Sequence, residues 1–403
     1  MLKGFLRVFH PPRLGYGLYG KIKDSILIIT SECGYPSGKC SYKTKYVDTA
    51  DDDALLVIGP VQHCGANAKP FVPISAFCAL RIMGIMMCCG VEAFFKIPGK
   101  LYSKILILLE WCSWVFSMQW LRNLYLERIL SEITEQYPIK KIGCIHEMHS
   151  YARVVWRFAS KRKIRTYTIQ HASVSSDKRW YFPYPEEIAQ GLMLPDVFYA
   201  FERRVVDLLA PYFPNTTFLM GCSCRYKEWK SVEPGPVDQD NGYYLFVSGL
   251  ARFDNEAVVS SLRQLVNKGG LPVRLRLRMH SHADLNRKLK RWVDRGKVSG
   301  MITVSNGDPL YSDLAGAKIV IGMSTTVMEE ALLMGRPVVQ LKHPDYSSYV
   351  DLDGISGVKH VAYDKLSNEL LQSFRVTVDA SEIRTRFGLA HSLVDYRRLF
   401  SES

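Results

Sequence analysis

The chain has 403 residues, more than one hydrophobic core ordinarily supports, so two domains are expected. Its 47% hydrophobic and 23% charged residues predict a globular protein and exclude an intrinsically disordered one. The net charge of +13 favours polyanionic partners, but the basic residues are spread along the chain without a nucleic-acid motif, so nucleic acid is not an expected partner.

The ten cysteines include no Cys-x-x-Cys pair, and several lie within apolar runs, where free thiols behave as small hydrophobic side chains. This usage favours a reducing environment, so a cytoplasmic location is expected. The first 21 residues lack the apolar core of a secretory signal. They could form a short basic amphipathic anchor or pack as an ordinary terminus.

A G-x-G-x-x-G run occupies residues 15–20 and is followed by Lys21. A phosphate-binding loop needs a strand before the glycines and a helix after them. Here Pro11 and Pro12 precede the run, and Ile22 stands where a Walker loop has Ser or Thr. We therefore predict a surface turn, which argues against a nicotinamide enzyme or a kinase.

Short apolar segments at 26–30 and 54–60 are predicted to be early strands of a first α/β domain. Two longer apolar segments, 72–95 and 101–121, approach the ~20 residues needed to cross a bilayer. Charged residues interrupt both segments, and a charge at mid-membrane costs about 2.5–3.5 kcal/mol. Buried or interfacial helices are therefore expected in place of membrane spans.

Polar clusters follow the next two predicted strands. The strand at 139–145 is followed by His146, Glu147 and His149, and the strand at 164–169 is followed by Gln170 and His171. The segment between them reads as a helix, and a β-α-β crossover brings both clusters to the same edge of a parallel sheet. Ligands bind at this edge in such sheets.

A zinc site at these histidines is not expected. The metalloprotease pattern has histidines four apart on a helix, whereas His146 and His149 are three apart at a strand end. The sequence offers no obvious third ligand.

Residues 227–243 are polar and contain two prolines and two glycines, which predicts a domain boundary. The predicted domains are 1–235 and 236–403. In the second domain, a strand at 244–247 ends at Ser248 and Gly249, and a strand at 273–279 ends at His280. Helices are expected at 256–266 and 283–294, and tail helices after residue 372.

The most informative unit runs from Asp308 to Leu341. Its pattern predicts a short helix, a strand buried on both faces, a hydroxyl-rich turn, a second helix and a second strand. The expected bounds are 311–317, 318–321, 322–326, 327–334 and 338–341. Ser324, Thr325 or Thr326 can cap the second helix, and such hydroxyls beside helix N–H groups also suit a phosphate.

This unit, with its Glu-bearing helix and a Gly-x-Pro before the last strand, resembles the donor-binding half of GT-B glycosyltransferases that build bacterial surface polysaccharide. More narrowly, it is similar to the Ser-Ser/Ser-Thr motif of sialyltransferase-like and β-Kdo transferase-like enzymes, which use CMP-activated sugars. The resemblance implies an α/β fold of two Rossmann-type domains with parallel sheets facing across a cleft. Residues 1–235 would bind the acceptor, and residues 236–403 would bind the nucleotide sugar.

The implied activity is transfer of a sugar, Kdo or a sialic acid, from a CMP-sugar to a lipopolysaccharide or capsule glycan. The CMP-sugar is a substrate, and neither a cofactor nor a metal is implied. The acceptor would be a lipid-linked glycan or an oligosaccharide, and the protein would be peripheral to the inner membrane on its cytoplasmic side. A helix lying in the membrane interface would suit such an acceptor.

The resemblance also suggests roles for single residues. His280 stands where the family has a His-Pro motif, with Ser281 in place of the proline, and its imidazole would contact the donor phosphate. The other donor-binding candidates are Arg278, Ser248, Gly249, Ser324, Thr325 and Thr326. Gln170 and His171 match a family Gln-His-Gly in which Ala172 replaces the glycine, and they are acceptor-side candidates.

Glu147 and Asp254 are the candidate catalytic carboxylates, together with His280. One carboxylate would deprotonate the acceptor in an inverting enzyme or attack the anomeric carbon in a retaining one. Glu147 could instead interact with a helix dipole, and Asp254 could be a helix N-cap.

Three alternatives remain open. A polyol-phosphate transferase using CDP-glycerol would transfer a phosphodiester in place of a glycosidic bond. A nucleotide-sugar epimerase shares the architecture, but residues 324–326 lack a Ser-Gly-Gly turn. A non-catalytic glycan-binding protein would lose no activity when His280 and Ser324 are both changed to Ala.

Overall fold

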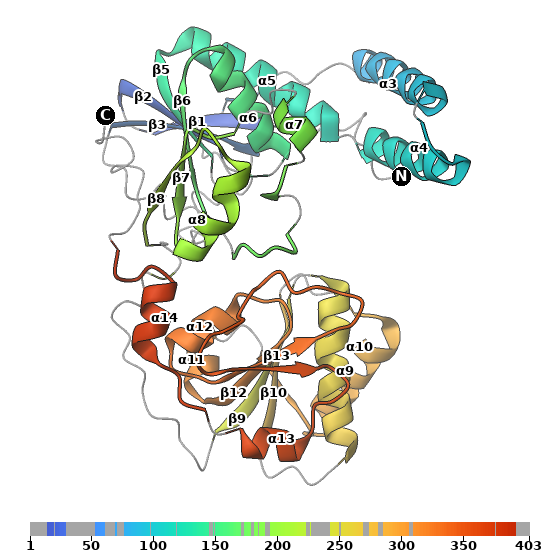
Figure 1. Ribbon diagram of the computed structural model, residues 1–403, viewed down its shortest axis with the longest axis vertical. Coiled ribbons are helices and arrows are strands. Elements are labelled where there is room, and N and C mark those ends of the chain that lie inside the picture. Colours follow the sequence, from blue (N-terminus) through green and yellow to red (C-terminus); the bar gives the residue numbers. More distant parts are fainter. Residues whose placement is uncertain are drawn as a thin grey trace.

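The computed structural model describes residues 14–19, 21–29, 53–60, 69–70, 76–96, 98–117, 119–144, 148, 150–170, 173–178, 181–183, 185–189, 194–222, 226, 242–249, 251–268, 274–280, 285–305, 309–374 and 376–391. Within these ranges the chain forms two sheets, each with its own helices (Figure 1).

The first sheet contains eight described strands in the order β4-β1-β3-β2-β5-β6-β7-β8. Their bounds are β1 (Leu14–Tyr19), β2 (Lys21–Ile29), β3 (Asp53–Pro60), β4 (Lys69–Pro70), β5 (Ile139–Cys144), β6 (Arg165–Ile169), β7 (Val197–Ala200) and β8 (Thr217–Met220). The strands β3, β2, β5, β6, β7 and β8 are parallel to one another. Strand β1 pairs antiparallel with both β3 and β4.

The surface turn predicted at the glycine-rich run is wrong, because residues up to Tyr19 form β1. Tyr16 and Leu18 alternate with the glycines and pair with Ile58 and Leu56 of β3. This distant strand supplies the backbone partners of β1, and local composition does not reveal such a partner.

The described helices of the first half are α3 (Ala76–Lys96), α4 (Leu101–Ser117), α5 (Gln119–Gln136), α6 (Ser150–Lys161), α7 (Pro185–Ala189) and α8 (Arg203–Leu209), followed by the 3-10 turn η3 (Ala210–Tyr212). Val155 and Phe158 of α6 are buried in one cluster with Ile129 and Leu130 of α5. The helices α3 and α4 form a hairpin that extends away from the sheet (Figure 1). In the described part of the chain, neither these nor other helices are both long and apolar enough to span a membrane.

The second sheet contains six described strands in the order β11-β10-β9-β12-β13-β14, and each described neighbouring pair is parallel. The strand bounds are β9 (Tyr243–Val247), β10 (Arg274–Arg278), β11 (Thr303–Val304), β12 (Ala317–Gly322), β13 (Val338–Lys342) and β14 (Val358–Ala362). The helix bounds are α9 (Arg252–Lys268), α10 (Arg287–Val298), α11 (Leu310–Ala315), α12 (Val327–Leu333), α13 (Asn368–Ser373) and α14 (Ala380–Arg386).

Strand β12 lies inside this sheet and is buried on both faces. Ile319 and Ile321 pack into the apolar cluster that includes α9 and α10, whereas Val320 packs into the cluster that includes α12 and α14. Each such side chain contributes roughly 1.5–3 kcal/mol by burial. The strand therefore holds the turn that follows it firmly in place.

The α/β class with two parallel sheets is confirmed. The predicted boundary at residues 235/236 lies outside the described residues; β8 ends at Met220 and β9 begins at Tyr243. Helix α10 begins later than predicted, because the Asn286 side chain accepts a hydrogen bond from the Leu289 N–H and so sets the N-terminus of the helix.

The chain after α14 reaches the first half at Gly388. This glycine has φ +67°, and a Cβ built on it would lie 2.5 Å from the Phe201 carbonyl oxygen and 2.9 Å from that of Gly221. Both close contacts are with backbone atoms, so no side-chain movement can relieve them.

We expect Gly388→Ala to lower the free energy of unfolding by at least about 3 kcal/mol, from the unfavourable φ and the steric overlap together. Gly354→Ala is the control, because Gly354 has φ +72° but no atom within 4 Å of the added Cβ. Urea denaturation of both variants separates the two effects. Equal losses of unfolding free energy in the two variants would show that the close contact of Gly388 with the carbonyl oxygens of Phe201 and Gly221 adds nothing to the cost of the substitution.

Candidate functional site

Three neighbouring strands of the second sheet end at one place. Strand β9 lies between β10 and β12 and is parallel to both, so Ser248, Gly249, His280 and the turn at 322–326 share the carboxyl edge of the sheet. The Ser248 hydroxyl accepts a hydrogen bond from the His280 backbone N–H (2.9 Å), and the Ser248 N–H donates to the Arg278 carbonyl (3.0 Å). Ser248 is buried, and His280 is exposed.

Asp254, in the first turn of α9, joins two of these turns. Its Oδ1 accepts from the Ser324 N–H (3.2 Å), and the Gly249 N–H also donates to the carboxyl group. A Cβ on Gly249 would lie 1.8 Å from Asp254 Oδ2, so this approach requires glycine. Asp254 is only 1% exposed, and its carboxyl group links the turn at Gly249 to the turn at Ser324. A direct chemical role for Asp254 stays a prediction.

Burial raises the pKa of Asp254 to about 7, and the two backbone N–H donors only partly offset this effect. A carboxyl group whose pKa is higher in the folded state stabilises the protein in its protonated form, so stability is lost as pH rises towards 7. Of the interval from pH 5 to pH 8, only the part below the folded-state pKa of about 7 contributes, which is two pH units at about 1.36 kcal/mol each.

We therefore expect the free energy of unfolding to fall by about 3 kcal/mol more in the wild type than in Asp254→Asn between pH 5 and pH 8. The amide has no charge to bury at either pH. Guanidinium denaturation at the two pH values measures this difference. The same pH profile for both proteins would rule out Asp254 as its source.

The hydroxyl-rich turn is tied to a later loop. The Ser324 hydroxyl accepts from the Tyr349 N–H (2.7 Å), and the Thr325 hydroxyl accepts from the Val327 N–H (3.4 Å). The N-cap residue of α12 is Thr326, whose side chain makes no capping hydrogen bond. Of the three predicted capping hydroxyls, that of Thr325 therefore binds a backbone N–H at the start of α12. Helix α12 is short, with seven residues.

Arg278 contacts a buried carboxylate of its own half. Asp313 of α11 forms ion pairs with Arg278 (2.5 Å) and Arg276 (2.6 Å), and its side chain is fully buried. This cluster fixes β10 against α11. A direct contact between Arg278 and a donor substrate stays a prediction.

A group of aromatic rings beside the turn was not predicted. Phe253 of α9 stacks on Tyr346 with ring centres 4.5 Å apart, and Tyr349 meets Phe253 edge-on at 6.4 Å. His343 stacks on Tyr363 at 4.6 Å. The spacing of aromatic residues after β13, His-Pro-Asp-Tyr-Ser-Ser-Tyr, was the available sequence signal.

On the facing sheet, Gln170 follows β6 and is 2% exposed. Its Oε1 accepts from the Phe201 N–H (2.9 Å), and its own N–H donates to the Tyr199 carbonyl (2.9 Å). Gln170 thus fixes the carboxyl ends of β6 and β7. The candidates His171 and Glu147 lie outside the described residues, so their acceptor-side and catalytic roles stay predictions.

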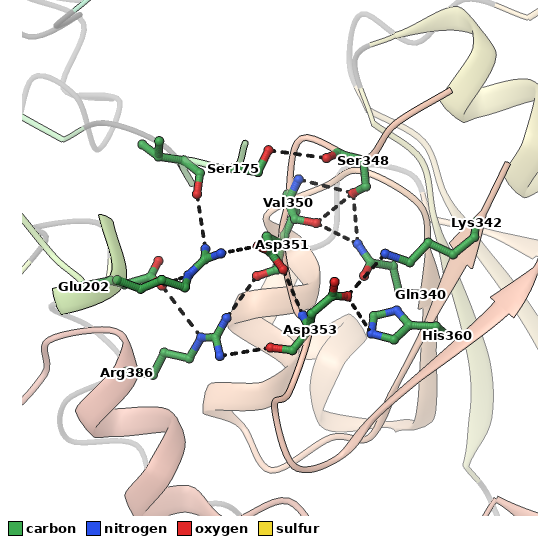
Figure 2. Close-up of polar contacts among 12 residues, drawn as sticks. Ser175, Glu202, Gln340, Lys342, Ser348, Val350, Asp351, Asp353, His360 and Arg386 are labelled. Carbon is green, nitrogen blue, oxygen red and sulfur yellow. Dashed lines mark hydrogen bonds and ion pairs between the residues drawn. The ribbon is translucent and has the colours of Figure 1, made fainter. Parts of the chain in front are cut away.

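Polar contacts connect the first half of the chain to the second half (Figure 2). Arg204 pairs with Asp351, and Arg386 lies 3.7 Å from Glu202 Oε2. Burial raises the pKa of Glu202, although the arginines oppose the shift. The Ser175 hydroxyl donates to the Ser348 carbonyl at 3.5 Å.

Buried Gln340 links these contacts to the hydroxyl-rich turn. Its Nε2 donates to the Met323 and Val350 carbonyls (3.2 and 2.8 Å), and the Ser348 hydroxyl also donates to the Met323 carbonyl (2.8 Å). Hydrogen bonds therefore connect the turn at 322–326 to the loop at 343–349, and through that loop to the contacts between the two halves.

A cavity of about 620 Å³ lies elsewhere, at the amino ends of β6 and β7. Its lining includes Trp156, Arg165 and Asp196. Because β6 and β7 are parallel, their amino ends lie at the edge opposite Gln170, so we do not assign this cavity to the candidate site.

In the part of the chain that the structure describes, we find no group of three His, Cys, Asp or Glu residues that could hold a metal ion. His146, Glu147 and His149 lie outside that part.

No protein-family model matches the sequence, and comparison with curated proteins gives no significant match. Solved structures do match. UDP-GlcNAc 2-epimerase from Methanocaldococcus jannaschii has a TM-score of 0.51 and 12% identity, covering 94% of this chain and 99% of that one. The Neisseria meningitidis UDP-GlcNAc 2-epimerase bound to UDP-GlcNAc has a TM-score of 0.49 and 14% identity, with 92% and 95% covered.

The lipopolysaccharide outer core galactosyltransferase WaaB has a TM-score of 0.46 and 10% identity, with 92% of each chain covered. The similarity to the Methanocaldococcus jannaschii structure, at a TM-score above 0.5 but 12% identity, shows the fold alone, which is of the GT-B type, and fold alone does not determine substrate or reaction.

Proposed function

We propose that this GT-B-type chain is a glycosyltransferase that takes a sugar from a CMP-activated donor and transfers it to a lipid-linked or oligosaccharide acceptor. The observation that carries this proposal is the convergence of Ser248, Gly249, His280 and Ser324 at the carboxyl edge of the second sheet. Ligands of open parallel α/β sheets bind outside this edge. Kdo or a sialic acid as the sugar, and a lipopolysaccharide or capsule glycan as the acceptor, come from the resemblance of the turn.

In this proposal the donor phosphate lies against the turn at 322–326. The hydroxyls of Ser324, Thr325 and Thr326 and the imidazole of His280 would stabilise charge on the phosphate as the bond to the sugar breaks. Arg278 adds positive charge nearby and is held in position by Asp313. Tyr346 is 45% exposed, and Phe253 stacks against one face of its ring. The cytosine can stack on this ring.

The acceptor hydroxyl would attack the anomeric carbon from the side of the first sheet. A carboxylate must receive its proton, and Glu147 is the candidate for this role, following β5. Buried Asp254 would act by holding the turns at Gly249 and Ser324 in register. We propose that the reaction takes place on the cytoplasmic side of the membrane, with the protein peripheral to it.

A thermal-shift comparison of CMP, CDP, UDP and GDP tests the donor. At a hundredfold excess over Kd, a bound nucleotide stabilises the folded state by about 2.7 kcal/mol. We expect CMP to stabilise the wild type and to stabilise Tyr346→Ala and His280→Ala less. Stabilisation by UDP or GDP alone would contradict the proposed donor, and phosphodiester products from CDP-glycerol would favour the polyol-phosphate alternative.

A further inference from the structure

The α3–α4 hairpin exposes large apolar side chains to an extent unusual for a water-facing surface. Phe95 of α3 is 75% exposed, and Tyr102 and Leu101 of α4 are 72% and 65% exposed. Ile85 and Val91 of α3 are exposed as well. Exposed large apolar side chains gathered on two helices that pack together mark an interaction site.

The apolar residues of α4 do not form a single stripe. Ile105, Leu106 and Ile107 are consecutive and each is more than 40% exposed. Successive residues of a helix point about 100° apart, so these three cover more than half of its circumference. A protein partner requires one apolar face, whereas a helix that is apolar on most sides suits surroundings that are apolar on most sides, such as lipid.

The hairpin is built as a unit. The Trp111 indole N–H of α4 donates to the Met86 carbonyl of α3 (2.9 Å), and Gly90 lies directly against the Trp111 ring, where a Cβ would lie 2.2 Å from Cδ1 of the ring. The exposed surface ends where the chain enters the body, since Val115 and Trp120 are buried. The apolar surface is therefore held in one arrangement.

Charge favours an anionic bilayer over other apolar partners. Arg81, Lys96 and Lys100 are exposed on the hairpin, and Lys96 neutralises Glu92 at 2.5 Å, which leaves Glu110 as the other exposed acidic residue of α3 and α4. Long basic side chains can place their charges among lipid headgroups while their stems stay in apolar surroundings. The net charge of +13 adds a general attraction to anionic surfaces.

We propose that the α3–α4 hairpin embeds in one leaflet of an anionic lipid bilayer and holds the protein on the membrane without spanning it. This inference deepens the proposed function. It rests on the proposed function only for the reason the protein binds membranes, which is to bring the site to a lipid-linked acceptor. Penetration of the hydrocarbon by exposed apolar side chains, with cations at the headgroups, is the binding mode of interfacial helices.

Vesicle flotation of the full chain tests this inference. We expect the protein to float with phosphatidylcholine vesicles containing phosphatidylglycerol, and flotation to persist in about 1 M salt, which screens exposed charges. Leu106→Glu/Leu109→Glu should reduce partitioning by about a hundredfold or more, because each buried charge costs several kcal/mol. Both leucines are about half exposed, so the variant should fold normally.

Val298→Glu/Met301→Glu is the matched control, with the same charge change at exposed apolar positions of the second half. It should float as the wild type does. Flotation of the hairpin variant equal to the wild type, or complete loss of wild-type flotation in high salt, would overturn the proposal. A wild-type dimer that dissociates in the hairpin variant, without flotation of either, would assign the surface to a second copy of the chain.

Flotation requires no nucleotide. Failure of CMP binding would therefore contradict the proposed function and leave the membrane inference standing. Failure of flotation would contradict the membrane inference and leave the proposed donor and transfer reaction standing.

Discussion

Replacing His280 with alanine should reduce sugar transfer by about 10²–10³-fold while leaving the protein folded. The side chain is exposed at the carboxyl end of β10, and the backbone hydrogen bond of His280 to Ser248 does not depend on the imidazole. Loss of charge stabilisation at the donor phosphate should lower kcat more than it raises KM. Steady-state kinetics with a CMP-sugar, alongside a thermal melt, measures both effects.

His391→Ala is the matched control, because His391 is also exposed but lies in the tail beyond α14. This variant should keep wild-type kinetics. If His280→Ala were as active as His391→Ala, the imidazole would have no part in the reaction.

Replacing Glu202 with alanine should lower the free energy of unfolding by about 3 kcal/mol or more. The carboxylate is buried between Arg204 (3.6 Å) and Arg386 (3.7 Å), and its removal leaves these guanidinium groups without this buried counter-charge. Glu202→Gln should cost less, because burial already raises the pKa of Glu202 and so disfavours its charged form. Urea denaturation gives both values.

Glu256→Ala provides the comparison for this prediction. Glu256 forms an exposed pair with Arg252 four residues before it on α9, and such pairs contribute at most about 0.5 kcal/mol. Similar losses for Glu202→Ala and Glu256→Ala would show that the cluster between the two halves contributes little to stability.

The sequence predicted the second sheet well where local signals agreed with burial. Strand β12 extends only one residue beyond its predicted range at each end, because a run of β-branched residues ending at a glycine is typical of a strand buried on both faces. The edge shared by Ser248, His280 and Ser324 was expected, because parallel strands present their carboxyl ends at one edge of a sheet, whereas the order of the strands was not predicted.

Features that depend on distant parts of the chain were missed. Strand β1 exists because β3 supplies its backbone partners, and its glycines by themselves indicate a turn. The contact of Asp254 with Ser324 joins residues 70 positions apart, and the sequence has no local pattern that connects them. The pairing of Arg204 with Asp351 and the stacking of Phe253 on Tyr346 likewise arise only from the packing of separate elements.

The most direct measurement is a crystal structure of the protein with bound CMP. We predict that the phosphate lies within hydrogen-bond distance of the turn at 322–326, with the His280 imidazole beside it and the cytosine against Tyr346. A nucleotide bound away from the carboxyl edge of the second sheet, or crystals that take up UDP at this edge and exclude CMP, would contradict it.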